Sequence, residues 1–242
     1  LRSNNRSEEK KSRFVSEIMI ASDNAAMIPG IIPVIDYSIE DYWYTMPIAQ
    51  SIMDFVNGKS LNEIIDGVLQ MCETLCKLHD KRIHHRDIKP SNIYYYDGRY
   101  AFGDFGLVDF PDNDDFTKSD RGLGAIFTIA PEMKRNPKLA DASKADVFSL
   151  AKTLWMFLSG DEKGFDGVYD YLDQSHSLRY VSRFKEEHLA EIDELLKDAT
   201  ENNPDLRPDI YEFTKRLLLW REIAGDFDKS QNSDWKFLTK QL

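Results

Sequence analysis

Two short polar motifs constrain the fold of this chain more than any other feature. They are HHRDIKPSN at residues 84–92 and GDFG at residues 103–106. Between them lie two short aromatic runs, Ile93 to Tyr96 and Tyr100 to Phe102, joined by Asp97-Gly98. An Asp-Gly pair between two such runs is typical of a hairpin turn. We therefore expect a hairpin that carries the second motif at its end.

The two motifs hold the residue types that a phosphoryl transfer needs. Asp87 can accept a proton from a hydroxyl group, and Lys89 can neutralise a transferring phosphoryl group. Asn92, through its amide oxygen, and Asp104 can hold Mg²⁺. Such a transfer needs little covalent help from the protein, so its site consists mainly of charges at suitable distances.

These motifs resemble the catalytic and DFG loops of eukaryotic-like protein kinases, in the form typical of Ser/Thr kinases. Three further kinase signatures follow in kinase order: APE at residues 130–132, ADVFSLA at residues 145–151 and NPDLRP at residues 203–208. A lone DFG is often only a turn, but five ordered matches argue against coincidence. The resemblance extends from about Phe14 to Trp220.

The resemblance implies a role for each polar residue of the two motifs. Asp87 would orient and deprotonate the substrate hydroxyl group, and Lys89 would stabilise the transferring phosphoryl group. Asn92 and Asp104 would bind Mg²⁺. ATP and Mg²⁺ are thus the expected cofactors, and a serine or threonine side chain of a protein is the expected substrate.

Other residues take structural roles by the same resemblance. Glu132 would pair with Arg207, and breaking such a buried or half-buried pair typically costs about 3–5 kcal/mol. Asp146 would brace the catalytic loop from below. His85 and Phe105 are expected to pack in the core rather than to take part in the chemistry.

The stretch before APE resembles an activation segment. It holds Thr117 and Ser119, and a phosphate on either could pair with Arg86. An ordinary polar loop is the alternative, because the acidic run at residues 112–115 would repel a phosphate.

The first fifty residues resemble part of a kinase small lobe. Apolar spacing predicts a helix from Lys11 to Ser22, with Glu17 as the helix-C glutamate. Ile31 to Ile35 and Trp43 to Ile48 read as strands of a hairpin around a polar turn at Asp36 to Asp41. The resemblance implies that five residues frame adenine: the gatekeeper Met46, the hinge residues Pro47, Ile48 and Ala49, and Tyr94.

The rest of the chain reads as mainly helical. Four segments have the clearest helical pattern: Leu61 to His79, Lys144 to Ser159, Leu189 to Thr200 and Asp209 to Ile223. We therefore predict an α+β, protein-kinase-like fold with a mainly helical C-lobe and a partial N-lobe made of helix C and two strands. Its expected parts are residues 1–49, residues 50–223 and a tail at residues 224–242 that docks on the lobe or is disordered.

The usual Gly-rich loop and strand lysine of a kinase do not precede Glu17. Lys10 and Lys11 read as solvated charges at a helix start, so Glu17 is expected to lack its usual partner. A truncated domain is the simplest interpretation, and a pseudokinase or scaffold that acts by binding a protein is the alternative. A small-molecule kinase fits less well, because such enzymes lack the long activation segment.

Composition agrees with a globular domain. The chain has 242 residues, 42% of them hydrophobic, and can bury a large core. A formal charge of −11 argues against nucleic-acid binding and favours basic protein substrates. Apolar runs are short, so we expect no membrane contact and a cytoplasmic location. A regulatory protein or an upstream segment is a possible further partner.

Cys72, Cys76 and His79 fall near one face of a helix, which makes a zinc site conceivable. The same helix carries Leu69, Leu75 and other apolar residues at helical spacing, so we interpret the cysteines as part of a buried stripe. Neither their number nor their spacing suggests a disulfide.

Overall fold

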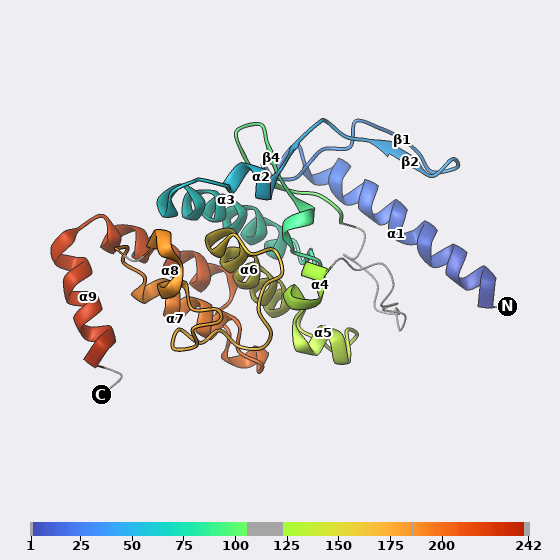
Figure 1. The fold of residues 1–242 in the computed structure, drawn as a ribbon. Helices are drawn as coiled ribbons and strands as arrows, with labels where there is room; N and C mark the ends of the chain where they lie inside the picture. The colour runs from blue at the N-terminus through green and yellow to red at the C-terminus, as the bar shows by residue number, and fades with distance from the viewer. Residues whose placement is uncertain (1, 106–122, 185, 240–242) are drawn as a thin grey trace.

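One long helix and a hairpin that lies along it form what we call the small lobe (Figure 1). We call the rest of the described chain, from Gln50 onward, the large lobe. This computed structural model describes residues 2–105, 123–184 and 186–239. Helix α1 is Arg2–Asn24, and strands β1 (Asp36–Ser38) and β2 (Trp43–Thr45) pair antiparallel with Tyr37 opposite Tyr44. The lobe is therefore a helix packed on a small sheet, as the sequence predicts.

Several boundaries of the small lobe differ from the prediction, and the strand predicted from Trp43 to Ile48 ends at Thr45. Helix α1 starts at Arg2 rather than Lys11, because the preceding Arg, Glu and Lys residues are themselves good helix formers. The segment Ile31 to Ile35 is not a strand of the hairpin, which begins at Asp36. Ile31 forms only an isolated bridge to Phe102, and its apolar character reflects burial against the large lobe.

A second sheet lies where the lobes meet. Strands β3 (Gln50–Ser51), β4 (Ile93–Tyr96) and β5 (Arg99–Phe102) follow the order β3-β4-β5, and all pairs are antiparallel. The tight β4–β5 hairpin is confirmed, with Asp97 and Gly98 both at positive φ in its turn. Ile32 N donates to the carbonyl of Phe102 at 2.9 Å, so the sheet also holds the chain that arrives from the small lobe.

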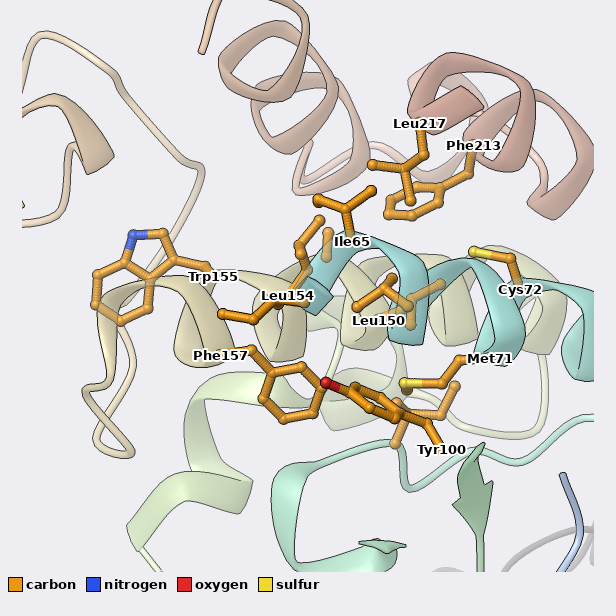
Figure 2. Close-up of a cluster of buried hydrophobic side chains, with 14 of the residues drawn as sticks. Ile65, Met71, Cys72, Tyr100, Leu150, Leu154, Trp155, Phe157, Phe213 and Leu217 are labelled. Atoms are coloured by element: carbon orange, nitrogen blue, oxygen red, sulfur yellow. The ribbon is translucent and has the colours of Figure 1, made fainter. Parts of the chain in front are cut away.

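Three long helices, α3 (Leu61–Asp80), α6 (Ala142–Ser159) and α8 (Ile210–Ala224), surround the main core (Figure 2). In α6, 15 of the 18 residues are buried, so this helix runs through the centre of the large lobe. Cys72 on α3 is fully buried among apolar side chains, which is the interpretation made from its spacing. Figure 2 labels ten core side chains: Ile65, Met71, Cys72, Tyr100, Leu150, Leu154, Trp155, Phe157, Phe213 and Leu217.

Local polar contacts explain where these helices begin and end. Ser60 and Glu63 form a reciprocal capping box at the start of α3. The Asp141 carboxylate accepts from the amides of Ser143 and Lys144, so α6 starts two residues before the predicted Lys144. Gly160, at φ +76°, ends α6 in the left-handed conformation.

The remaining elements cover the large lobe. The helices α2 (Ile52–Val56), α4 (Leu123–Thr128) and α5 (Pro131–Arg135) are short, and α7 (Ala190–Ala199) packs against α6 and α8. The tail forms helix α9 (Phe227–Thr239), which docks on α7 and α8 at the end of the molecule far from α1 (Figure 1). Short 3₁₀ turns lie at Pro90–Asn92, Leu178–Tyr180, Ser182–Phe184 and Pro204–Leu206.

No helix in the described ranges is both long and apolar enough to cross a bilayer.

Candidate active site

Two residues of the first motif, Lys89 and Asn92, donate hydrogen bonds to the carboxylate of a third, Asp87. Lys89 Nζ donates to Asp87 Oδ2 at 2.6 Å, and Asn92 Nδ2 donates to the same oxygen at 3.0 Å. Asn92 Nδ2 also donates to the backbone oxygen of Asp87 at 2.9 Å. A carboxylate with these two donors is held in one orientation, with a cation beside it.

The amide of Asn92 is oriented by these contacts. Because its nitrogen donates twice to Asp87, its oxygen faces away from that residue and receives a long contact of 3.4 Å from Ser91 Oγ. An amide oxygen and the carboxylate of Asp104 are the hard oxygen donors that Mg²⁺ prefers. The donor chemistry therefore fits a divalent metal, with Asn92 and Asp104 as the residues that would hold it.

The two motifs are joined through their backbones. Gly103 N donates to the carbonyl of Asn92 at 2.9 Å, and His85 Nε2 donates to the carbonyl of Gly103 at 3.2 Å. The ring of His85 is fully buried, with the rings of Phe102 and Phe105 at centroid distances of 5.2 and 4.9 Å. His85 and Phe105 thus pack inward. The backbone of Asp104, between Gly103 and Phe105, has a positive φ of +58°.

Asp146 on α6 holds the start of the first motif from below. Its carboxylate accepts from the backbone amides of His85, at 2.8 Å, and Arg86, at 2.7 Å. His79 Nε2 donates to the same carboxylate at 3.0 Å. Burial alone would raise the pKa of Asp146, but these donors lower it, so the buried residue stays ionised.

Arg86 lies where the loop turns sharply, with φ +63°. Its Nε atom is buried and has no hydrogen-bond partner within the part of the chain that the structure describes. Thr117 and Ser119, the residues expected to carry a phosphate for Arg86, lie outside the described residues. The tether role of Arg86 stays a prediction.

Glu132 on α5 and Arg207 form a two-pronged ion pair. Arg207 Nη1 donates to Glu132 Oε1 at 2.6 Å, and Nη2 donates to Oε2 at 2.8 Å. The side chain of Arg207 is 0% exposed and lies over the ring of Phe148 at 4.8 Å. Lys144 Nζ donates to the carbonyl of Arg207 at 2.6 Å, which fixes the pair against α6.

A small cavity lies between α1, β2 and the second motif. Its lining includes Glu17, Tyr44, Met46, Asp104 and Phe105. Burial raises the pKa of Glu17 and also that of Tyr44, and the charge of Asp104 adds to both shifts. The predicted helix-C glutamate Glu17 and the predicted gatekeeper Met46 therefore line the same cavity as Asp104, a predicted metal ligand.

The predicted adenine-binding residues are arranged around the connection between the lobes. Met46 is 41% exposed and Ile48 is 100% exposed, in the segment that links β2 to β3. The ring of Tyr94 lies close to Gly103: a Cβ added at that glycine would come within 3.0 Å of the ring. Pro47 and Ala49 are partly buried in the same segment. Adenine binding by these residues stays a prediction.

The sequence did not point to two of these contacts. Tyr44 is a hydrogen-bond partner of Glu17 that the sequence did not indicate, since the expectation for Glu17 concerns only the absence of its usual lysine partner. His79, considered from sequence only as part of a cysteine face, pairs with Asp146 instead. Neither contact has a spacing signal, because the partners are 27 and 67 positions apart.

The chain is similar in sequence to known protein kinases. A sequence model for the protein kinase domain matches residues 1–221. The chain is 31% identical over 147 residues to serine/threonine-protein kinase PDK1 of Cryptococcus neoformans, covering 58% of this chain and 12% of that protein. It is 27% identical over 203 residues to human receptor-interacting serine/threonine-protein kinase 1, covering 77% of this chain and 29% of that protein.

The chain is also similar to a bacterial kinase. Serine/threonine-protein kinase PrkC of Bacillus subtilis is 29% identical over 152 residues, covering 57% of this chain and 22% of that protein. The chain thus spans less than a third of the length of each of these three relatives.

Proposed function

The chain belongs to the protein kinase domain family, and from this membership we propose that it transfers the γ-phosphoryl group of ATP to serine and threonine hydroxyl groups of proteins. The observation that carries the proposal is the cluster of Lys89 and Asn92 around Asp87, which a backbone hydrogen bond joins to Gly103 beside Asp104. The relatives' names support the Ser/Thr class of acceptor.

Asp87 and Lys89 carry the chemistry in this proposal. The Asp87 carboxylate accepts the proton of the substrate hydroxyl group. It also orients the oxygen of that hydroxyl group toward the phosphorus atom. Lys89, 2.6 Å from Asp87 in the described state, places its ammonium group where negative charge develops on the transferring group. Asn92 keeps Asp87 in place with its two donated hydrogen bonds.

The family uses ATP with a divalent metal ion, and we propose Mg²⁺ as that ion. Asn92 and Asp104 would hold it, and the bound ion would neutralise charge on the phosphate oxygens. The segment from Met46 to Ala49, with Tyr94, would frame the adenine. Backbone N–H and C=O groups of that segment could form hydrogen bonds with the polar edge of the adenine ring.

Substrate and setting follow from the same chemistry. The net charge of −11 favours basic protein segments as substrates over nucleic acid. We propose the cytoplasm as the compartment, because ATP and free thiols such as that of Cys72 both fit it. Phosphorylation of Thr117 or Ser119, read by Arg86, is the proposed mode of activation.

Loss of the proton acceptor tests the proposal. Asp87→Asn keeps the shape of the side chain but removes the carboxylate, so kcat should fall by about a hundredfold to ten-thousandfold. The measurement is phosphate incorporated into a basic Ser/Thr-containing protein from Mg·ATP. Asp97→Asn is the matched control, because Asp97 is exposed in the β4–β5 turn and asparagine accepts its positive φ.

Two results would contradict the proposal. One is an Asp87→Asn variant that transfers phosphate as fast as the Asp97→Asn control. The other is a wild-type protein that binds Mg·ATP yet modifies no protein, which would favour a domain that acts by binding.

A further inference from the structure

A hydrogen bond between Tyr44 and Glu17 joins β2 to α1 at the wall of the cavity beside Asp104. The Tyr44 hydroxyl donates to Glu17 Oε1 at 2.7 Å. One turn earlier in α1, the ring of Phe14 lies against those of Tyr42 and Tyr44, with centroids 5.6 and 5.9 Å apart. Helix α1 is thus held on the hairpin by ring contacts and by a directed polar contact.

The polar contact meets a need that the rings cannot meet. Glu17 is partly buried and lies near the charge of Asp104, and both effects disfavour an ionised carboxylate. A hydrogen-bond donor offsets this, and Tyr44 is a dependable one. Burial and the neighbouring acids raise the pKa of Tyr44, so its hydroxyl keeps its proton at physiological pH. Without that donor, Glu17 would move toward water and carry α1 with it.

The position of the bond links three parts of the site. Tyr44 lies two residues before Met46, where the chain continues into the proposed adenine-binding segment. Glu17 faces the same cavity from α1, and Asp104 and Phe105 face it from the second motif. The hydrogen bond therefore joins two of the elements that line this cavity, and the proposed metal ligand Asp104 lines it from a third part of the chain.

We infer that Tyr44 is a positioning residue for phosphoryl transfer: its hydroxyl holds Glu17, and with it α1, at the distance from Asp104 that Mg·ATP binding requires. The inference rests on the proposed function and adds to it a residue outside the kinase motifs. Tyr44 need not touch the nucleotide for this role. It acts through Glu17 and through the position of the helix.

Tyr44→Phe is a clean probe because it removes one oxygen and keeps the ring that packs on Phe14. Tyr42→Phe is its matched control. The Tyr42 ring touches the same phenylalanine, but Tyr42 is 49% exposed and its hydroxyl forms no hydrogen bond to a described residue. The variants are made in the full-length protein, alone and together with Glu17→Ala.

Four results are expected from steady-state kinetics and hydrogen exchange. Tyr44→Phe raises KM for Mg·ATP about tenfold, the effect of one hydrogen bond to a charged group, and leaves KM for the protein substrate within about twofold. Tyr42→Phe changes neither value. In the Glu17→Ala background, Tyr44→Phe adds no further effect, because the contact is already lost. Backbone amides of α1 around Glu17 exchange faster in Tyr44→Phe without nucleotide.

The outcomes separate the inference from the function on which it rests. If the wild type is active and Tyr44→Phe has the same KM for Mg·ATP as Tyr42→Phe, only the inference is overturned. A lower melting temperature without that change in KM would show a purely structural role and also overturn it. A wild type that transfers no phosphoryl group overturns both.

Discussion

Arg207 shows how much stability a single buried contact can carry. Its guanidinium group is fully buried, and Glu132 is the carboxylate that accepts from both of its terminal nitrogens. Glu132→Ala would leave that cation buried without its counter-charge. The free energy of unfolding should fall by about 3–5 kcal/mol, measured by urea denaturation.

An exposed ion pair gives the control for this prediction. Lys215 and Glu212 lie 3.5 Å apart with side chains 79% and 49% exposed. Glu212→Ala should cost less than about 1 kcal/mol, because water already solvates both groups. Equal losses in the two variants would mean that burial of Arg207 is not what makes its pair stabilising.

Single residues were predictable from sequence where a motif names both partners. Glu132 and Arg207 belong to two such motifs, and their contact follows from them. Tyr44 and His79 belong to none. Their hydrogen bonds to Glu17 and Asp146 depend on how separate elements pack, and packing of this kind leaves no local signal in the chain.

At the scale of elements, helix α9 is held to the large lobe by a histidine between two acids. His188 Nδ1 pairs with Asp234 on α9 at 2.9 Å, and its Nε2 pairs with Glu191 on α7. Ser233 on α9 also donates to Glu191. A histidine can donate from both nitrogens only when it is protonated, so docking of α9 should depend on pH.

The sign of the pH dependence follows from the pKa shifts. Burial would lower the pKa of His188, but Glu191 and Asp234 raise it above the usual 6.5. Its stabilising effect is therefore complete below about pH 6.5 and is lost as the pH rises through the folded-state pKa. Burial would raise the pKa of Glu191, but His188 and Ser233 lower it below 4.5, so its contribution is lost only in stronger acid.

His188→Gln measures this effect directly. The variant should lose about 1–2 kcal/mol of unfolding free energy near pH 5.5, a modest value because Asp234 is 41% exposed. The loss should be close to zero at pH 8.5. Lys229→Gln, which removes the ion pair between Lys229 on α9 and Glu222 on α8, should cost the same small amount at both pH values. A His188→Gln loss that is equal at both pH values would rule out the titration.

Helices were easier to predict than strands for a physical reason. The starts of α3 and α8 follow from local capping residues, Ser60 and Asp209, which the sequence displays. The limits of β1 depend instead on packing against a strand that is far away in the sequence. Ile31 and Ile32 are 3% exposed because they pack on β5, so their apolar character does not indicate a strand of the hairpin.

At the scale of the molecule, stability should be unevenly distributed. Helix α6 is buried along most of its length, whereas the described β1–β2 sheet is short, with Trp43 42% exposed. A two-stranded sheet is marginally stable in water. Native-state hydrogen exchange followed by mass spectrometry should therefore find α6 amides opening only with global unfolding, and β1–β2 amides opening at far lower free energy.

Protection of the hairpin equal to that of α6 would contradict this distribution. The exchange of α3 serves as an internal reference, because it lies in the same core as α6. Mg·ATP should slow exchange in α6, because binding stabilises the native state against global unfolding, and also in those parts of the small lobe whose opening disrupts the nucleotide site.

The carboxylate of Asp146 has a consequence for how such a sequence can change over generations. The loop it holds has no regular structure around Arg86, so the shape of the loop depends on hydrogen bonds to a residue of helix α6. A substitution that shifts Asp146 on the 18-residue α6 helix should therefore also displace the proposed catalytic residues Asp87 and Lys89. Selection for folding and selection for activity therefore act on the same residues of α6. Both restrict the substitutions that this helix can accept.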